Sequence, residues 1–132
     1  MKVKKPHYHE TLHHLVPQSR CHELGIKDKD DQRNLRKIDD EKHRVWHALF
    51  TNSTPHEVVH QLYALYEAQM DIIMLGRTEW TILFGTMNLL EVCDEVIRNW
   101  MPPQSLLPFV FYTRNNKKFR TFVQGLLNKQ RP

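Results

Sequence analysis

All nine histidines of this chain lie between positions 7 and 60, and the 72 residues that follow contain none. The chain has only two cysteines, too few for a disulfide framework or for a cysteine-rich zinc site. Imidazole in this quantity, without paired cysteines, indicates metal ligation or acid–base chemistry. The first half of the chain is therefore expected to fold so that some of these rings meet.

Two of the histidines share one side of a predicted helix. Acidic residues at positions 39–41 favour a helix N-terminus there. His43 and His47 follow one turn apart, about 40° apart around the helix axis. The other side of this helix is apolar, with Val45, Trp46, Leu49 and Phe50. The helix can therefore pack by one face and offer two imidazoles from the other, as two ligands of one metal require.

A short strand is predicted over residues 8–16, which mix β-branched, aromatic and leucine residues and stop at a proline. Neighbouring side chains of a strand point to opposite faces. One of His13 and His14 can therefore join the metal while the other points away, unless a bend brings both to one cleft. A polar loop to residue 33 leads into a second short strand at 34–38.

The remaining chain is predicted to be helical. Residues 54–57 read Thr-Pro-His-Glu, a capping-box pattern with proline at the first helical position, and the helix continues to about residue 74. A further helix is predicted over 78–100, ended by two prolines, and a last one over 116–129. The last helix has an apolar stripe, Phe119, Phe122, Val123, Leu126 and Leu127. This stripe is expected to face inward, with dimerisation as the alternative.

The histidine motifs resemble those of a known family. Residues 13–19 read His-His-Leu-Val-Pro-Gln-Ser, and an Asn-Leu pair follows at Asn34. His43 and His47 lie nine and thirteen residues after that asparagine. In this order and at these spacings, the elements resemble the His-Asn-His (HNH) endonucleases of the ββα-metal fold. The resemblance covers about residues 7–52 and nothing beyond them.

The resemblance implies a role for each matched residue. The ligands of one divalent metal ion would be His13, His43 and His47. His14 would be the general base that activates a water, and Asn34 would orient the ring of this base. A neutral imidazole, with a pKa near ~6.5, can take a proton from water at pH 7, and a divalent ion stabilises charge on the phosphoryl and leaving oxygens. The ion stays open among Zn²⁺, Ni²⁺, Mn²⁺ and Mg²⁺, although all-imidazole ligation suits Zn²⁺, Ni²⁺ or Co²⁺ better than Mg²⁺.

The chain departs from the family in one structural respect. Many members hold a structural zinc with two cysteine pairs beside the active helix, whereas residues 39–42 here read Asp-Asp-Glu-Lys. Packing must then support the hairpin, because some 50 residues without zinc or disulfide rarely fold alone. We therefore predict an α+β fold, in which an HNH-like ββα-metal element at residues 1–52 packs against a bundle of about three helices at 53–132.

The charge distribution favours a polyanionic partner. The net charge is +4, but residues 53–112 carry −5 and residues 113–132 carry +6. A basic end beside an acidic middle suggests contact with nucleic acid, or else a solvated helix face. Five cations flank the histidine motifs and are candidates for phosphate contacts: Arg20, Arg33, Arg36, Lys37 and Arg44. Ordinary solvation is an equal alternative for each of them singly.

The sequence predicts a small metal-dependent endonuclease that hydrolyses DNA phosphodiester bonds with low intrinsic sequence specificity. Nothing in it resembles a recognition helix or a zinc finger that would read bases. The alternative is a catalytically silent HNH-fold module that binds nucleic acid or protein. A third reading has the helical half bind a protein partner or self-associate. No apolar run reaches the ~18 residues of a bilayer span, and few cysteines suit a reducing compartment, so a cytoplasmic protein is expected.

Overall fold

A computed structural model describes residues 10–70, 77–108 and 117–129. These residues form an α+β structure with one two-stranded antiparallel sheet. Strand β1 (Glu10–His14) pairs with β2 (Leu35–Asp39), and α2 (Asp40–Phe50) follows β2 directly. The connection between the strands contains α1 (Gln18–Cys21) and two short 3₁₀ turns. The predicted start of the first strand, at residue 8, lies outside the described residues.

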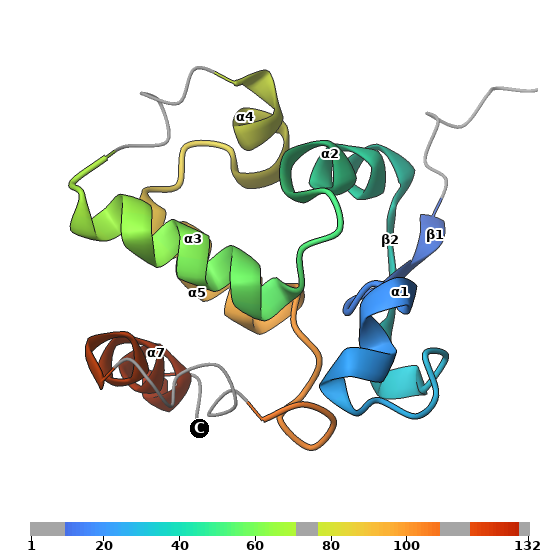
Figure 1. The fold of residues 1–132 in the computed structure, drawn as a ribbon. Helices are drawn as coiled ribbons and strands as arrows, with labels where there is room; N and C mark the ends of the chain where they lie inside the picture. Colours follow the sequence, from blue (N-terminus) through green and yellow to red (C-terminus); the bar gives the residue numbers. More distant parts are fainter. Residues whose placement is uncertain (1–9, 71–76, 109–116, 130–132) are drawn as a thin grey trace, which may run out of the picture.

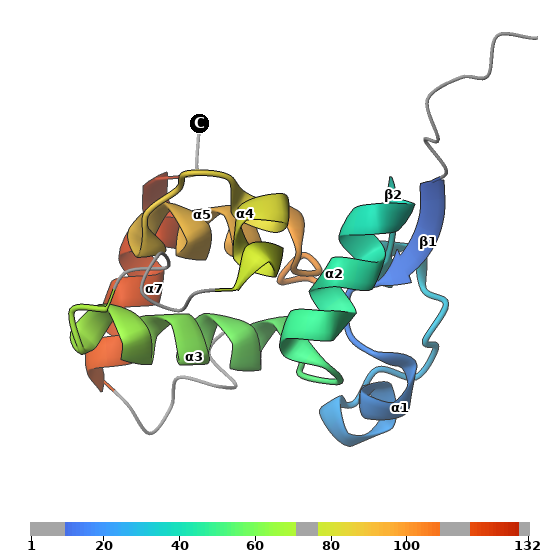
Figure 2. The same cartoon turned by 90° about the horizontal axis from the view of Figure 1, so that it is seen from above.

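Four further helices follow in the described part of the chain: α3 (Pro55–Glu67), α4 (Thr78–Phe84), α5 (Leu89–Asn99) and α7 (Lys117–Lys129). The predicted capping box of α3 is present, because the Thr54 hydroxyl accepts from the Glu57 N–H and the Glu57 carboxylate accepts from the Thr54 N–H. Figures 1 and 2 show the hairpin and α1 at one end of the molecule and α7 at the other. Helix α2 lies between the hairpin and the other helices.

The single helix predicted over residues 78–100 is wrong, because the structure has two helices there. Helix α4 ends at Gly85, whose φ of 61° lies in the left-handed region that favours glycine. Helix α5 then starts anew, with a capping box between Asn88 and Glu91. Four helices therefore follow α2 in the described residues, where about three were predicted.

One hydrophobic cluster joins α2 to the later helices. Val45, Trp46 and Phe50 of α2 are buried in the same cluster as side chains of α3, α4, α5 and α7. The predicted stripe of α7 does face inward, since Phe119, Val123 and Leu126 are buried and Phe122 and Leu127 pack against them. The core thus continues across the predicted boundary between residues 52 and 53.

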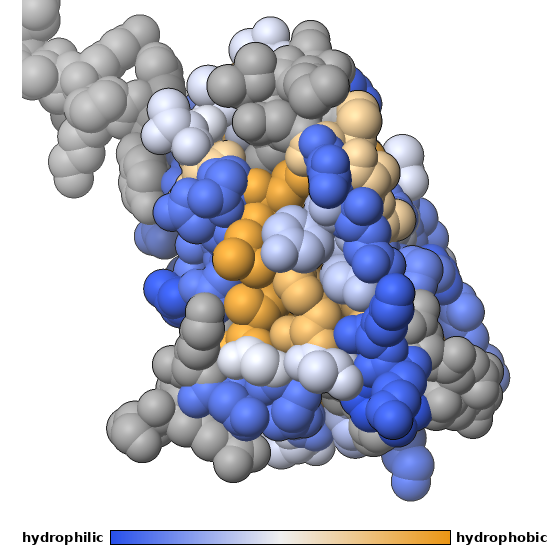
Figure 3. Space-filling model, turned by 90° about the vertical axis from the view of Figure 1, so that its left-hand side faces the viewer, coloured by the Kyte–Doolittle hydropathy of each residue, from blue (hydrophilic) through white to orange (hydrophobic). Residues whose placement is uncertain are grey.

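A second, smaller cluster lies beneath the connection between the strands. Val16, Cys21 and Ile26 are buried there together with Leu107, which comes from the segment after α5. On the face of the molecule opposite to the hairpin, apolar side chains are open to view between hydrophilic ones (Figure 3). None of the described helices combines the length and the hydropathy needed to cross a bilayer.

Candidate metal centre

The pleat of β1 decides which histidine faces α2. Because side chains alternate along a strand, Thr11 and His13 share one face, and Leu12 and His14 share the other. Thr11 and His13 both contact the ring of His43 on α2. His13 is 1% exposed, whereas Leu12 is 55% exposed. The strand therefore buries one histidine under α2 and turns its neighbour away.

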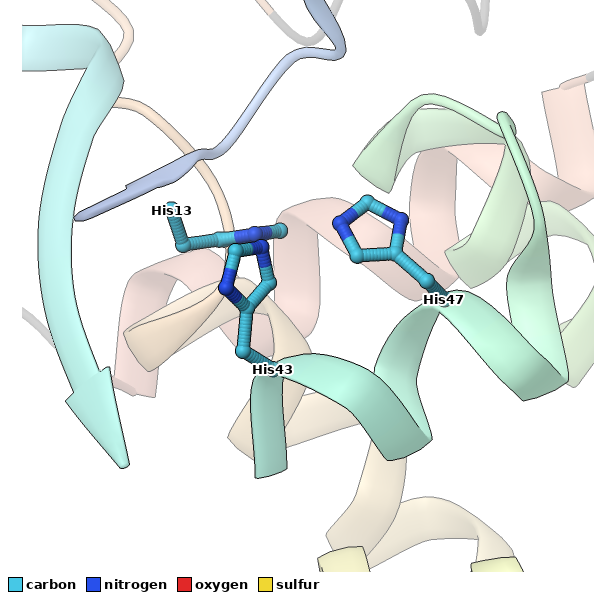
Figure 4. A group of neighbouring side chains, drawn as sticks. All are labelled: His13, His43 and His47. Atoms are coloured by element: carbon cyan, nitrogen blue, oxygen red, sulfur yellow. The ribbon is translucent and has the colours of Figure 1, made fainter. Parts of the chain in front are cut away.

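Helix α2 presents the other two rings of the cluster. His43 and His47 lie one turn apart with ring centroids separated by 4.8 Å. The centroid of the His13 ring is 4.9 Å from that of His43 and 5.5 Å from that of His47. The three rings converge in Figure 4, and one nitrogen from each lies within 4.8 Å of the others. The structure thus brings together the three side chains that were predicted as metal ligands.

Hydrogen bonds outside the cluster orient the two rings of α2. Nδ1 of His43 is 2.8 Å from Oγ1 of Thr11. Nδ1 of His47 is 3.3 Å from the carbonyl oxygen of Thr51 and donates to it. With Nδ1 occupied in this way, Nε2 of each ring is the atom left for the cluster. Outer partners of this kind fix the tautomer and orientation of metal-binding histidines.

His13 is buried as an unsatisfied polar group. Both of its ring nitrogens are buried, and within the described residues neither has a hydrogen-bond partner. Burial, followed by the neighbouring rings of His43, His47 and His14, lowers the pKa of His13 to about 3. Burial likewise lowers the pKa of His43. His13 is therefore held neutral, which is the form that binds a metal ion.

Two tryptophans close the inner side of the cluster. Trp46 of α2 and Trp100, the C-cap of α5, stack with centroids 4.1 Å apart and rings 3° from parallel. The His13 ring packs edge-on against them, 5.5 Å from Trp100 and 6.1 Å from Trp46. Both halves of the chain therefore build the apolar wall that keeps water from His13.

The donor set fits a small divalent transition ion. A tetrahedral zinc with bonds of ~2.1 Å holds its ligand nitrogens roughly 3.4 Å apart, so the three nitrogens, which lie within 4.8 Å of one another, would have to approach by up to roughly 1.4 Å. Three imidazoles leave a fourth position for water or substrate, as in catalytic zinc sites. The unpartnered nitrogens of His13 favour this interpretation over an ordinary core histidine, because buried polar groups are otherwise almost always hydrogen-bonded.

A cleft of about 380 Å³ opens beside the cluster. It is lined by Leu12, His14, Pro17, Gln18, Ser19, His43, His47 and Asn52. Nε2 of His14 is 2.9 Å from Oδ1 of Asp30, and Nδ1 of His14 is 3.4 Å from the amide nitrogen of Gln18. His14 therefore reaches the cleft from the face of β1 opposite to His13.

The side chain of Asn34 binds the loop instead of the His14 ring. Its Oδ1 accepts from the Val16 N–H at 2.8 Å, and its Nδ2 donates to the carbonyls of Val16 and Lys29 at 3.1 and 3.0 Å. The resemblance implied that Asn34 orients the base, but the observed hydrogen bonds of its side chain hold the loop. Asn34 fixes the backbone two residues after His14, while the group in contact with that ring is Asp30.

Two of the five predicted phosphate-binding cations are already paired with carboxylates. Arg20 forms ion pairs with Glu23 and with Glu57, the latter at 2.7 Å. It thereby ties α1 to the N-terminus of α3. Arg33 pairs with Asp31 at 2.8 Å. Both guanidinium groups are held by acidic neighbours, so their first role is in the fold.

The other three predicted cations are exposed on β2 and α2. Arg36 donates to the side-chain oxygen of Asn99 at 3.2 Å. Lys37 and Arg44 are exposed as well. These three remain the better candidates for contact with a polyanion.

Three contacts at the centre involve residues that were not predicted: Thr11, Asp30 and Trp100. Thr11 had a signal in the sequence, because it lies two residues before His13 and hence on the same face of the strand. Asp30 and Trp100 had none. One belongs to a loop without periodicity, and the other is far along the chain from the histidines.

Comparisons with protein family models, with curated proteins and with solved structures found no match to this chain. The geometry of the site and the motifs of the chain are therefore the only indications of its function.

Proposed function

We propose that this chain is a metal-dependent endonuclease of the HNH type that hydrolyses DNA phosphodiester bonds with low intrinsic sequence specificity. The observation that carries the proposal is the pair of unpartnered nitrogens of His13, which meet His43 and His47 at the edge of a cleft. The order strand, strand, helix, with the asparagine between the histidine motifs, supports it. The proposal is further supported by His14, a fourth histidine that lines the cleft and lies outside the three-histidine cluster.

The adjacent histidines of β1 have separate tasks in this proposal. His13 binds the ion together with His43 and His47. The bound ion supplies positive charge to the phosphoryl oxygens and to the departing oxygen. Zn²⁺, Ni²⁺, Mn²⁺ and Mg²⁺ are the candidates, and the three imidazoles favour the transition ions among them.

His14 is the general base. Its Nε2–H donates to Asp30, so the lone pair of the neutral ring is on Nδ1, on the side of Gln18, which also lines the cleft. A water displaces the long 3.4 Å contact between Nδ1 and the Gln18 amide, and Nδ1 takes a proton from this water as its oxygen bonds to phosphorus. The ester P–O bond breaks, and its electron pair leaves with the departing sugar oxygen, which is then protonated from solvent. A positioned base contributes about 10²–10⁴-fold to such a step.

The substrate class follows from charge and from the shape of the site. The cleft is open and lined by neutral polar groups near the histidines, which suits a backbone phosphate more than a particular base. Arg36, Lys37 and Arg44 are exposed on the adjoining β2 and α2. Contacts of such cations with phosphates supply affinity without sequence preference.

Nicking of supercoiled plasmid tests the proposal. The purified protein is incubated with plasmid and Mg²⁺, Mn²⁺, Ni²⁺ or Zn²⁺, beside His14→Ala and His43→Ala. The parent should nick, His14→Ala should lose about 10²–10⁴-fold in rate with metal affinity within a few-fold, and His43→Ala should lose the metal. Calorimetric titration measures the affinities.

The proposal would be contradicted if the parent failed to nick plasmid with any of the four ions. It would also be contradicted if the His14→Ala variant nicked at the parental rate. Tight binding of plasmid in a gel-shift assay without nicking would then support the silent binding module. If His14→Ala lost the metal and His13→Ala kept it, the roles of these two neighbours would have to be exchanged.

A further inference from the structure

Asp30 makes a directed contact with the proposed general base. Its Oδ1 is 2.9 Å from Nε2 of His14, sixteen residues back in the chain. On the other side of the ring, the amide nitrogen of Gln18 is 3.4 Å from Nδ1. A carboxylate accepts and an amide N–H donates, so both neighbours require the same tautomer. The proton is on Nε2 and the lone pair is on Nδ1.

The loop around Asp30 is built to hold this carboxylate in place. The Asp30 N–H donates to Oδ1 of Asp28 at 2.9 Å, and the Asp31 N–H donates to the carbonyl of Asp28 at 3.0 Å. The carbonyl of Lys29 accepts from Nδ2 of the buried Asn34. The turn that carries Asp30 is thus anchored in the interior, although the carboxylate itself is half-exposed.

We infer that Asp30 is the positioning residue that holds His14 with its Nδ1 lone pair toward the cleft. The inference rests on the proposed function, in which His14 takes the proton from water. The hydrogen bond from His14, and then that from Lys29, lowers the pKa of Asp30, so the carboxylate is ionised at neutral pH. An ionised carboxylate can only accept, and it therefore excludes the tautomer that would block Nδ1 with a proton.

The competing interpretation is that His14 and Asp30 form an ordinary surface pair without function. Such exposed pairs are common and contribute little to stability. The two interpretations differ in what is lost on mutation. If Asp30 only pairs at the surface, removing it changes neither turnover nor the tautomer of His14. If it positions the base, kcat falls about tenfold or more, while KM and metal affinity stay within a few-fold. Asp30 is absent from the three-histidine cluster, so the ion should be unaffected.

The experiment compares Asp30→Ala and Asp30→Asn with a matched control. Asp94 of α5 also forms an ion pair, and its partner is Arg98. Asp94→Ala therefore removes an ion-paired carboxylate that does not line the cleft. Plasmid nicking gives kcat and KM for each protein. Long-range ¹H–¹⁵N correlation spectra of the imidazoles give the tautomer of His14 in the intact protein, and His14→Gln assigns its signals.

The expected result is an Nε2–H tautomer in the parent and a mixture of tautomers in Asp30→Ala, with the tenfold loss in kcat. Asp30→Asn can turn its amide N–H toward Nε2 of His14, which favours the tautomer with the proton on Nδ1, so it should lose at least as much as Asp30→Ala. Asp94→Ala should match the parent. An active parent whose Asp30→Ala variant keeps both kcat and tautomer overturns the inference and leaves the proposed function standing. If the parent fails to cleave plasmid with any of the four ions, the proposed function is overturned, and the role of Asp30 is overturned with it.

Discussion

Replacing His13 by leucine is expected to stabilise the metal-free protein and to abolish its response to metal. The His13 ring is buried, neither of its nitrogens has a hydrogen-bond partner among the described residues, and each such group costs about 1–3 kcal/mol. Leucine has no polar atom and a similar volume. The loss of ring contacts with Trp46 and Trp100 would lower the stability of the variant by up to about 1.5 kcal/mol. The change of side-chain shape would lower it by up to about 1.5 kcal/mol more. With a central cost of about 2 kcal/mol for each nitrogen, the net gain is about 1 kcal/mol or more, or roughly 3 °C or more in Tm for a chain of this length.

Thermal unfolding at pH 7.5, in EDTA and with Zn²⁺ or Ni²⁺, measures this gain. Imidazole is almost entirely neutral at that pH in both states, so proton uptake contributes little. Metal at a hundred times its Kd should stabilise the parent by about 2.7 kcal/mol and the His13→Leu variant not at all. His47→Leu is the control, because this exposed ligand should lose the metal response without a metal-free gain. A lower Tm for metal-free His13→Leu would refute the reasoning.

Three further predictions concern the surroundings of the cluster. Asn34→Ala should lower the free energy of unfolding by about 2–4 kcal/mol in urea titrations, because it leaves buried loop N–H and C=O groups without partners. Trp100→Leu should cost about 2–4 kcal/mol in the same assay and weaken metal binding measured by calorimetry. Burial lowers the pKa of His56 to about 3, so the native state binds fewer protons than the unfolded state between pH 6.5 and 3. Stability of the metal-free protein should therefore fall on acidification through that range, by up to about 1.4 kcal/mol per pH unit for this residue, and the dependence in urea titrations should be shallower in His56→Gln.

The local patterns of the chain predicted part of the candidate site, whereas the choice of His13 over His14 as a ligand came from the resemblance to the HNH family. Alternation along a strand separates His13 from His14, and the four-residue spacing of His43 and His47 places them on one side of a helix. These rules involve only neighbours in sequence. The observed cluster joins the strand histidine that lies under α2 to both histidines of the helix.

The parts that sequence reasoning missed depend on contacts between distant segments. The pairing of Arg20 with Glu57 spans 37 residues and requires the relative placement of α1 and α3. The partner of His14 depends on the conformation of an aperiodic loop. The break between α4 and α5 was readable, since Asn88 and Glu91 have capping-box spacing, but the apolar periodicity on both sides of Gly85 concealed it.

The position of the cluster explains how this hairpin is supported without a structural zinc. One side of α2 carries the two histidines, and its other side is buried in the hydrophobic cluster that also contains side chains of α3, α4, α5 and α7. Trp100 then brings the end of α5 to the ring of His13, through its stack with Trp46. Opening the helical half would therefore expose His13 and separate it from its apolar wall. Because an ion bound only by the folded state stabilises that state, metal binding and the packing of the helices should be coupled, and each should be weakened when the other is disturbed.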